Sequence, residues 1–351
     1  MAAAESLTVQ GRVTPQPRNP ALLAAASLLV SLLVGVVGYE AYENVQYYRW
    51  RAAYASGSDW HGRLTVPSQD ALLVWEYRPN TEFRNIRTNR FGFRDRDFES
   101  PGKPPGTFRV AFIGDSVTLG LGVDPDDTFV RRFESTANAG KARRPIQALN
   151  FGIDGYNTIQ IHELLRTRAL AFEPDEVVYV MSLNDFNLGG STGEKMGFFR
   201  KPPSFFLLNL WTLYTRLSAV GKAVPTNTEL HRWWFATGHE SVFAHVLEMR
   251  DLLHQRGIAF SVAVVPIFRF EEPTFADYPL EDVHRAVAQF CGTNHIPFTD
   301  LEEDFGRGAL APREYGDDIW HPNSQGHRVI AEELGRARLG ERPVLPSEIV
   351  Q

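Results

Sequence analysis

The chain has 351 residues, of which 43% are hydrophobic and 22% are charged, and its formal net charge is −6. This length allows one sizeable core with appendages, and a weakly acidic chain without a basic stripe argues against a nucleic-acid-binding protein. Cys291 is the one cysteine, so an intramolecular disulfide is excluded, and we interpret it as a small buried apolar residue rather than a nucleophile. No Cys/His cluster has the spacing of zinc ligands, so we predict neither a metal nor a cofactor.

Residues 21–39 form an apolar run without a charged side chain. A helix of this length approaches the thickness of a bilayer core, and we interpret the run as an uncleaved transmembrane anchor. The alternative is a cleaved signal peptide, which usually has a shorter apolar run and small residues at its cleavage site, whereas Glu40-Ala41-Tyr42-Glu43 follows here. A buried core helix is a third interpretation, and the absence of a polar face argues against it.

The segments around this run set the expected topology. Residues 1–20 are expected to be a disordered, proline-containing tail, and residues 40–107 a stem and N-terminal extension that begins with interface-type tyrosines and a tryptophan. Arginines lie on both sides of the run, so positive charge barely discriminates between orientations. The short tail is easiest to leave in the cytoplasm, and we therefore expect the bulk of the chain on the extracytoplasmic, periplasmic side.

From residue 108 onward, apolar strand-like segments alternate with helical ones. The predicted strands are 108–116, 145–153, 176–183, 259–267 and a weaker 296–300. Helical spacing predicts helices at 158–172, 241–257, 280–291 and about 323–338. This alternation is typical of an α/β domain, placed at 108–340, with a parallel sheet and helices on both faces.

An outsized insertion, about 187–238, separates the third and fourth predicted strands. Its segment 204–220 is rich in apolar residues, but it also contains an asparagine, two threonines and an arginine, which makes it too polar for a second transmembrane helix. We expect a helix packed on the core. The alternative is a lid or a membrane-dipping arm.

Gly114-Asp115-Ser116 directly follows the most apolar strand. Ligands of open parallel sheets bind beyond the carboxyl ends of the strands, so Ser116 is placed at a functional edge. By itself the motif is a weak signal for a nucleophile and favours an ordinary strand-to-helix turn in which the serine caps the helix.

Asp318-Ile319-Trp320-His321-Pro322 precedes the last predicted helix. A serine hydroxyl needs a base, which a histidine supplies, and the histidine needs a carboxylate that holds its tautomer. Asp318 and His321 are three residues apart, so one turn of chain can bring them together. A metal site built from Asp317, Asp318, His321 and His327 is disfavoured, because no cysteine or second histidine pair completes it.

Gly155 and Asn184 follow the second and third predicted strands. A glycine amide and an asparagine side chain are suitable donors to the negative charge that develops on a carbonyl oxygen during acyl transfer. Each is also an ordinary turn or cap residue when taken alone. The combination of a serine, two donors and an Asp/His pair at successive strand ends favours the catalytic interpretation.

With these residues the chain resembles the SGNH hydrolase superfamily, also called GDSL-like lipases and acylhydrolases. Gly114-Asp115-Ser116 matches its first block, Gly155 the second-block glycine, Asn184 the third-block asparagine, and Asp318 with His321 the fifth block. The resemblance covers about 108–338 and implies a three-layer α/β/α fold with a five-stranded parallel sheet. More weakly, 87–99 resembles a segment that precedes this domain in some extracytoplasmic bacterial members.

The resemblance also implies site roles. Ser116 would be the nucleophile, and the amides of Ser116 and Gly155 with the Asn184 side chain would form the oxyanion hole. One departure is Ser182, where the family usually has glycine; its Cβ is expected to crowd the backbone and shift Asn184 slightly.

These observations predict a serine esterase that hydrolyses an O-acetyl or other acyl ester through an acyl-enzyme. The alternatives are an O-acyltransferase that modifies an envelope polysaccharide and a non-catalytic carbohydrate-binding or scaffold protein. A flavodoxin-like binding domain is disfavoured, because no glycine-rich phosphate loop follows the first strand. The expected partners are an ester-bearing substrate, such as an envelope glycan or lipid, and the membrane through 21–39, with no nucleic acid.

Overall fold

The computed structural model describes residues 19–56, 63–139, 144–188, 201–219, 226–268, 274–308 and 310–339. The chain divides into two units. We call Met1–Arg49 with Pro202–Val220 the anchor unit, and Trp50–Lys201 with Gly221–Gln351 the sheet unit. The predicted disordered tail lies, up to residue 18, outside the described residues.

The anchor unit contains most of α1 (Pro20–Ala55), which includes the predicted transmembrane run. The most apolar window of this helix has a mean hydropathy of 2.5 and is not buried by the rest of the chain. It is the one helix among the described residues that is long and apolar enough to cross a membrane. The helix continues well past residue 39, so the start of the predicted stem is helical too.

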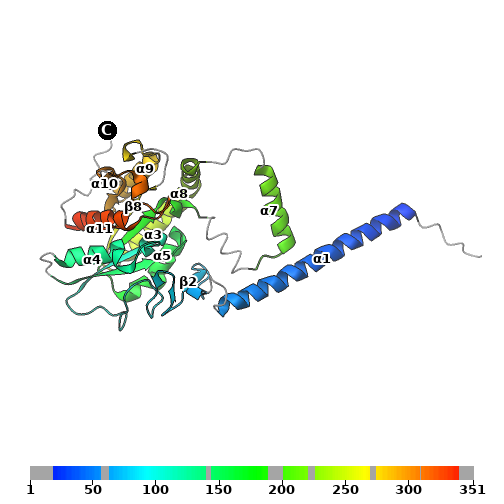
Figure 1. Ribbon diagram of the computed structural model, residues 1–351, viewed down its shortest axis with the longest axis horizontal. Helices are drawn as coiled ribbons and strands as arrows, with labels where there is room; N and C mark the ends of the chain where they lie inside the picture. The colour runs from blue at the N-terminus through cyan, green and yellow to red at the C-terminus, as the bar shows by residue number, and fades with distance from the viewer. Residues whose placement is uncertain are drawn as a thin grey trace, which may run out of the picture. The chain divides into compact units, whose positions relative to one another are not determined.

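The second helix of the anchor unit is α7 (Phe205–Ala219), which begins beside α1 (Figure 1). The expectation that this segment packs on the core was wrong, because its large apolar side chains are exposed: Leu207, Trp211 and Leu217 are 63–65% exposed. Its first turn is instead held by α1. The backbone amides of Phe205 and Phe206 donate to the Glu40 carboxylate at 3.1 and 2.8 Å.

The sheet unit is built on five parallel strands in the order β6-β5-β7-β8-β9. They are β5 (Phe108–Gly114), β6 (Ile146–Gly152), β7 (Glu176–Ser182), β8 (Ala259–Val265) and β9 (Phe298–Asp300). All five predicted strands are present, each ending close to its predicted limits. Their apolar side chains are almost entirely buried, as expected for strands covered on both faces.

Helices cover the sheet in two groups. Helix α4 (Phe129–Ala139) packs against α11 (Ser324–Leu339), whereas α8 (Asn227–His254) packs against α5 (Thr158–Thr167) and α9 (Glu281–Thr293). The α/β/α fold class is confirmed. The chain moves from β5 to β6 in one direction and from β6 past β5 to β7 in the other. In open α/β sheets, ligands bind at the carboxyl ends of the strands where the order reverses in this way.

Short elements connect these parts. They are α3 (Ser116–Leu119), η1 (Pro125–Asp127), η2 (Ala169–Phe172), η3 (Leu183–Phe186), η4 (Phe275–Asp277), α10 (Glu302–Gly306) and η5 (Pro312–Glu314). The helix predicted at 158–172 divides into α5 and η2. The helix predicted at 241–257 is the second half of α8, so the end of the predicted insertion, 227–238, is continuous with it.

The N-terminal extension forms two antiparallel hairpins, β1 (Thr65–Pro67) with β2 (Trp75–Tyr77) and β3 (Glu82–Phe83) with β4 (Ile86–Arg87). It shares the core of the sheet unit through buried Trp75 and Phe93. The buried guanidinium of Arg94 donates to the carbonyls of Leu119 at 3.0 Å and Val123 at 2.6 Å. These bonds join the extension to the segment that follows Ser116.

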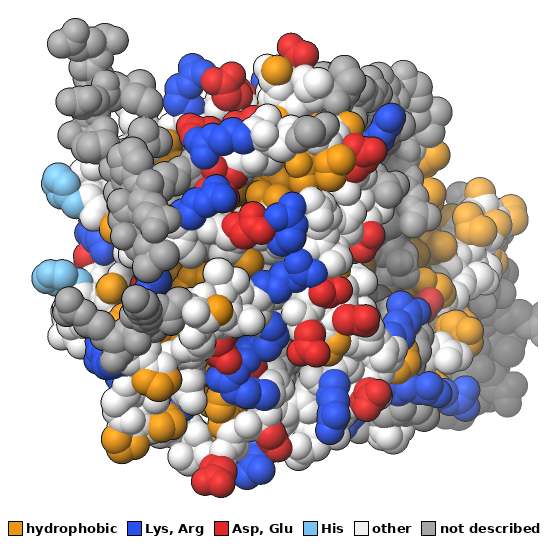
Figure 2. Space-filling view, turned by 60° about the vertical axis from the view of Figure 1, so that its left-hand side comes forward, with side chains coloured by type: hydrophobic (Ala, Val, Ile, Leu, Met, Phe, Trp, Pro, Cys, Tyr) orange, Lys and Arg blue, Asp and Glu red, His pale blue; other side chains and the backbone are white. Residues whose placement is uncertain are grey.

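The surface of the sheet unit carries charges of both signs. Figure 2 shows a face on which basic and acidic side chains are interspersed. Several of the charges are paired, as in Arg168–Glu76 at 2.6 Å and Arg132–Asp127 at 2.6 Å.

Candidate active site

Ser116 lies at the carboxyl end of β5, as the first residue of α3, and is 4% exposed. Asp115 caps this short helix, and its carboxylate accepts a hydrogen bond from the Val117 amide at 2.9 Å. The turn therefore contains a helix cap, and the capping residue is Asp115 rather than Ser116. The Ser116 hydroxyl is left for another partner.

That partner is His321, which the structure brings to Ser116 from 205 residues further along the chain. Its Nε2 lies 2.9 Å from Ser116 Oγ, and its Nδ1 lies 2.6 Å from Asp318 Oδ2. An ionised carboxylate only accepts, so Nδ1 carries the proton, and Nε2 accepts the Ser116 hydroxyl. Ser116, His321 and Asp318 thus form one hydrogen-bonded chain in the order that general-base activation of a serine requires.

Asp318 is held in place by its own turn. Its Oδ1 accepts the amides of Trp320 at 2.8 Å and His321 at 2.9 Å. Partial burial raises the pKa of this carboxyl, but the hydrogen bonds from His321 and Trp320 outweigh it, so the pKa lies below its ordinary value. Asp318 is consequently ionised at neutral pH, as a partner of an imidazolium must be.

The two predicted oxyanion donors lie at the same edge of the sheet. Gly155 follows β6 with a φ of +74°, a left-handed conformation that side-chain-bearing residues rarely adopt. Asn184 lies in η3 after β7, and its Nδ2 donates to Asp115 Oδ2 at 3.0 Å. An amide nitrogen carries two protons, so one bond to Asp115 orients the Asn184 side chain and leaves a second donor.

His327 does not join the metal set considered from the sequence. It is fully buried, its Nδ1 accepts the Phe129 amide at 3.2 Å, and its ring stacks on Phe129. Burial, together with Arg94 and Arg132, lowers the pKa of His327 to about 3. It is therefore a neutral core histidine that holds the start of α4.

A comparison with protein families decides to which family the chain belongs. Residues 112–329 match the family described as GDSL-like lipase/acylhydrolase. The chain belongs to this family. The predicted resemblance to the SGNH hydrolases is thereby confirmed, and family membership supports a role as a hydrolase that acts on esters.

Solved structures that are similar to this chain include esterases and lipases. A catalytic mutant of an acetylxylan esterase from Geobacillus stearothermophilus is 16% identical, with 66% of this chain and 93% of that chain covered and a TM-score of 0.43. A lipase from a goat rumen metagenome is 17% identical, with coverage of 68% and 100% and a TM-score of 0.44. A GDSL-like lipase from Bacteroides thetaiotaomicron is 17% identical, with coverage of 67% and 89% and a TM-score of 0.38. No curated protein matches the chain.

In this GDSL-family chain, a buried acidic network supports the turn of Ser116, and the sequence analysis did not predict it. Ser182 Oγ donates to Asp115 Oδ1 at 3.0 Å, while the Ser182 amide donates to Asp185 Oδ2, also at 3.0 Å. Tyr179 donates its hydroxyl to the same Asp185 oxygen at 2.8 Å. Burial raises the pKa of Asp115, and burial together with the charge of Asp115 raises that of Asp185 further.

The network also changes the interpretation of Ser182. Its backbone is extended, with φ −100° and ψ 153°, a conformation open to any residue. A side chain at the family's usual glycine position therefore causes no backbone strain here, and its hydroxyl joins the network instead.

The N-terminal extension reaches the Gly155 loop of this GDSL domain. Tyr77 Oη accepts the Asp154 amide at 3.2 Å, and Tyr156 donates its hydroxyl to the Trp75 carbonyl. Gln160 Nε2 donates to the Leu73 carbonyl at 2.9 Å. No motif predicts these contacts, because they join segments that are distant in sequence.

Proposed function

We propose that this protein is a membrane-anchored serine esterase, with Ser116 as nucleophile, His321 as general base and Asp318 as the partner that orients His321. The observation that carries the proposal is the hydrogen-bonded chain from Ser116 Oγ through His321 to Asp318, at 2.9 and 2.6 Å. Such a chain turns a weakly nucleophilic hydroxyl into an acyl acceptor.

In this mechanism Ser116 Oγ attacks the ester carbonyl while its proton moves to His321 Nε2. The developing imidazolium is stabilised by ionised Asp318. His321 then returns the proton to the departing alcohol, which leaves an acyl-enzyme on Ser116. Water, activated by the same histidine, attacks this ester and releases the acid and the free serine.

The negative charge on the carbonyl oxygen requires donors that are fixed in advance. We assign them to the Ser116 and Gly155 amides and the Asn184 side chain. Three observations support the assignment: the left-handed backbone of Gly155, the bond between Asn184 and Asp115, and the adjacency of β5, β6 and β7. One such donor is worth roughly 2.7–4 kcal/mol of barrier in a well-studied protease.

The test is turnover of an activated acetyl ester by the full-length chain. Ser116→Ala should lower kcat by at least about 10⁴-fold, and Asp318→Asn by about 10⁴-fold because the wrong tautomer of His321 is then favoured. Retained turnover in Ser116→Ala, at an unchanged melting temperature, would falsify the assignment. Measuring free acetate against acetyl transferred to an added polysaccharide distinguishes water from a sugar hydroxyl as acceptor.

The anchor unit supports the membrane part of the proposal. Most apolar side chains of α1 are exposed along the predicted span, with Leu28 75% and Leu29 69% exposed, which is costly in water. We place this span in a bilayer. The periplasmic orientation is tested by fusing to the C-terminus a reporter enzyme that is active only outside the cytoplasm. An intact but inactive fusion would show the opposite orientation.

A further inference from the structure

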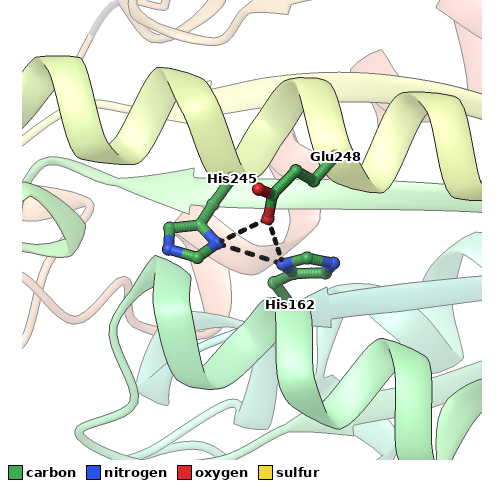
Figure 3. A group of neighbouring side chains, drawn as sticks. All are labelled: His162, His245 and Glu248. Carbon is green, nitrogen blue, oxygen red and sulfur yellow. Dashed lines mark hydrogen bonds and ion pairs between the residues drawn. The ribbon is translucent and has the colours of Figure 1, made fainter.

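Two histidines and a glutamate meet between α5 and α8, outside the residues assigned to the reaction (Figure 3). Nδ1 of His162 lies 3.1 Å from Nδ1 of His245. Oε2 of Glu248 lies 3.3 Å from the first nitrogen and 3.2 Å from the second. The three atoms therefore form a nearly equilateral triangle and face a common centre. His162 and His245 are 83 residues apart in sequence, which is why no ligand spacing predicts the group.

Hydrogen bonds alone cannot satisfy this triangle when both rings are neutral. A ring nitrogen offers one position in its plane, occupied by either a proton or a lone pair. If His245 donates to His162, neither Nδ1 has a proton left for Glu248. If both donate to Glu248, two N–H groups oppose each other across 3.1 Å. A cation at the centre satisfies all three atoms at once, because each then presents a lone pair.

The dimensions suit a small transition-metal ion. Zinc lies about 2.0–2.1 Å from histidine nitrogen and about 2.0–2.2 Å from carboxylate oxygen. With tetrahedral angles, two such ligand atoms are about 3.4 Å apart. The three observed separations fall within a few tenths of an ångström of that value.

We propose that His162, His245 and Glu248 bind a first-row transition-metal cation, with Zn²⁺ as the ion that fits best. Imidazole nitrogens with one carboxylate are a ligand set that zinc accepts, and a fourth position remains for water. The site is reachable, since the side chains of His162, His245 and Glu248 are 14%, 25% and 60% exposed.

The surroundings do not oppose a cation. The nearby Arg166 is paired with Glu163 through two bonds of 2.9 and 2.5 Å, which offsets its charge.

Such an ion would tie together two helices that adjoin the proposed oxyanion donors. Helix α5 begins just after the Gly155 loop. Helix α8 packs closely on η3, which carries Asn184: a Cβ on Gly238 would collide with the Phe186 carbonyl. We therefore expect a stabilising role for the metal, as a clip between α5 and α8.

The experiment uses the full-length chain in detergent, without a polyhistidine tag, stripped with a chelator and titrated with Zn²⁺ alone. We expect one Zn²⁺ per chain and a higher melting temperature with the ion. His245→Ala and Glu248→Gln should each weaken the Kd at least about tenfold and reduce the thermal shift. His254→Ala is the matched control, since His254 is an exposed histidine on the same helix.

Glu248 is largely exposed, so Glu248→Gln keeps the test decisive even if a histidine variant folds poorly. Equal Zn²⁺ binding by wild type and a His162→Ala/His245→Ala/Glu248→Gln triple variant would overturn the proposal, as would no binding by the wild type. Ser116→Ala should bind Zn²⁺ like the wild type, so the outcome is independent of the proposed catalytic role.

Discussion

Ser182 Oγ donates a 3.0 Å hydrogen bond to Asp115 Oδ1, across the space between the end of β7 and the turn that carries Ser116. Asp115 in turn accepts the side-chain amide of Asn184. One buried carboxylate therefore connects the proposed nucleophile turn to a proposed oxyanion donor. The hydroxyl of Ser182 helps to fix that carboxylate.

Replacing Ser182 should affect both stability and rate. Ser182→Gly restores the family's usual residue but removes one hydrogen bond to a buried carboxylate, at a cost of about 1.5–3 kcal/mol of unfolding free energy. We expect a lower kcat with little change in KM, because Asn184 loses part of its support. Chemical denaturation and steady-state kinetics measure the two effects.

Ser261→Ala is the matched control for this variant. Ser261 lies on β8 in register with Val178, towards the other end of the sheet from the proposed catalytic edge. It should leave kcat unchanged. A Ser182→Gly chain as stable and as active as the wild type would show that the bond has no role.

The Gly155 loop should depend on a tyrosine from the N-terminal extension. Tyr77→Phe removes the acceptor of the Asp154 amide and leaves that amide without its partner, at a cost of about 1–3 kcal/mol. Because Asp154 precedes Gly155, the proposed amide donor shifts, and kcat should fall more than KM rises.

Gly155→Ala should lower kcat as well, because a φ of +74° costs alanine about 1–2 kcal/mol of backbone strain. Unchanged kinetics in both variants would remove Gly155 from the oxyanion hole.

Local signals in the sequence predicted most of the sheet and the proposed triad. Continuous apolar runs identified the five strands, and the positions of Ser116, Asn184 and His321 after strands or before the last helix identified the edge of the sheet. These signals suffice because parallel strands present their carboxyl ends together. The division of 158–172 at Arg168 and the continuity of α8 through 227–238 lack such local signals.

Contacts between distant segments could not be predicted in the same way. The bond between Ser182 and Asp115, the grip of Tyr77 on the Gly155 loop and the meeting of His162 with His245 all depend on tertiary packing. The segment 204–220 was assigned to the core because it is too polar for a second membrane span, whereas in the structure its large apolar side chains are exposed and Glu40 holds its first turn. Composition alone does not distinguish a core from a lipid environment.

His327 should make the stability of the chain pH-dependent. Its pKa is about 3 in the folded protein and about 6.5 in the unfolded chain, so the unfolded state binds a proton between these values and the folded state does not. The contribution of neutral His327 to the free energy of unfolding is complete above pH 6.5, and it is lost as the pH falls towards 3. Between pH 7 and pH 5 the free energy of unfolding should fall by about 2 kcal/mol for this reason.

His327→Gln should remove this part of the pH dependence, because glutamine keeps an acceptor for the Phe129 amide and does not titrate. Urea denaturation at pH 7 and pH 5 measures it. His254→Gln, at an exposed position, is the control and should behave like the wild type. An identical pH dependence in His327→Gln and wild type would contradict the assignment of this histidine as neutral and buried.

Helix α7 should lie in lipid together with the apolar part of α1. Its large apolar side chains are exposed from Leu207 to Leu217. Asn209 Nδ2 donates to Tyr39 Oη at 2.6 Å, next to the Glu40 contact. Tyr39 ends the apolar run of α1, at the depth where a membrane interface is expected. Because an uncovered apolar helix is costly in water, we expect α7 to be inserted at that interface.

A single fluorophore tests this placement. Cys291 is buried and is the one cysteine, so Cys291→Ala provides a background for Leu210→Cys on α7. In lipid nanodiscs the probe at 210 should show blue-shifted emission and be quenched by lipids that carry a quencher in their acyl chains. Arg285→Cys, on an exposed face of α9, is the control and should show neither effect. If the probe at position 210 showed the emission typical of water, α7 would not lie in lipid. The proposed membrane contact would then be limited to α1.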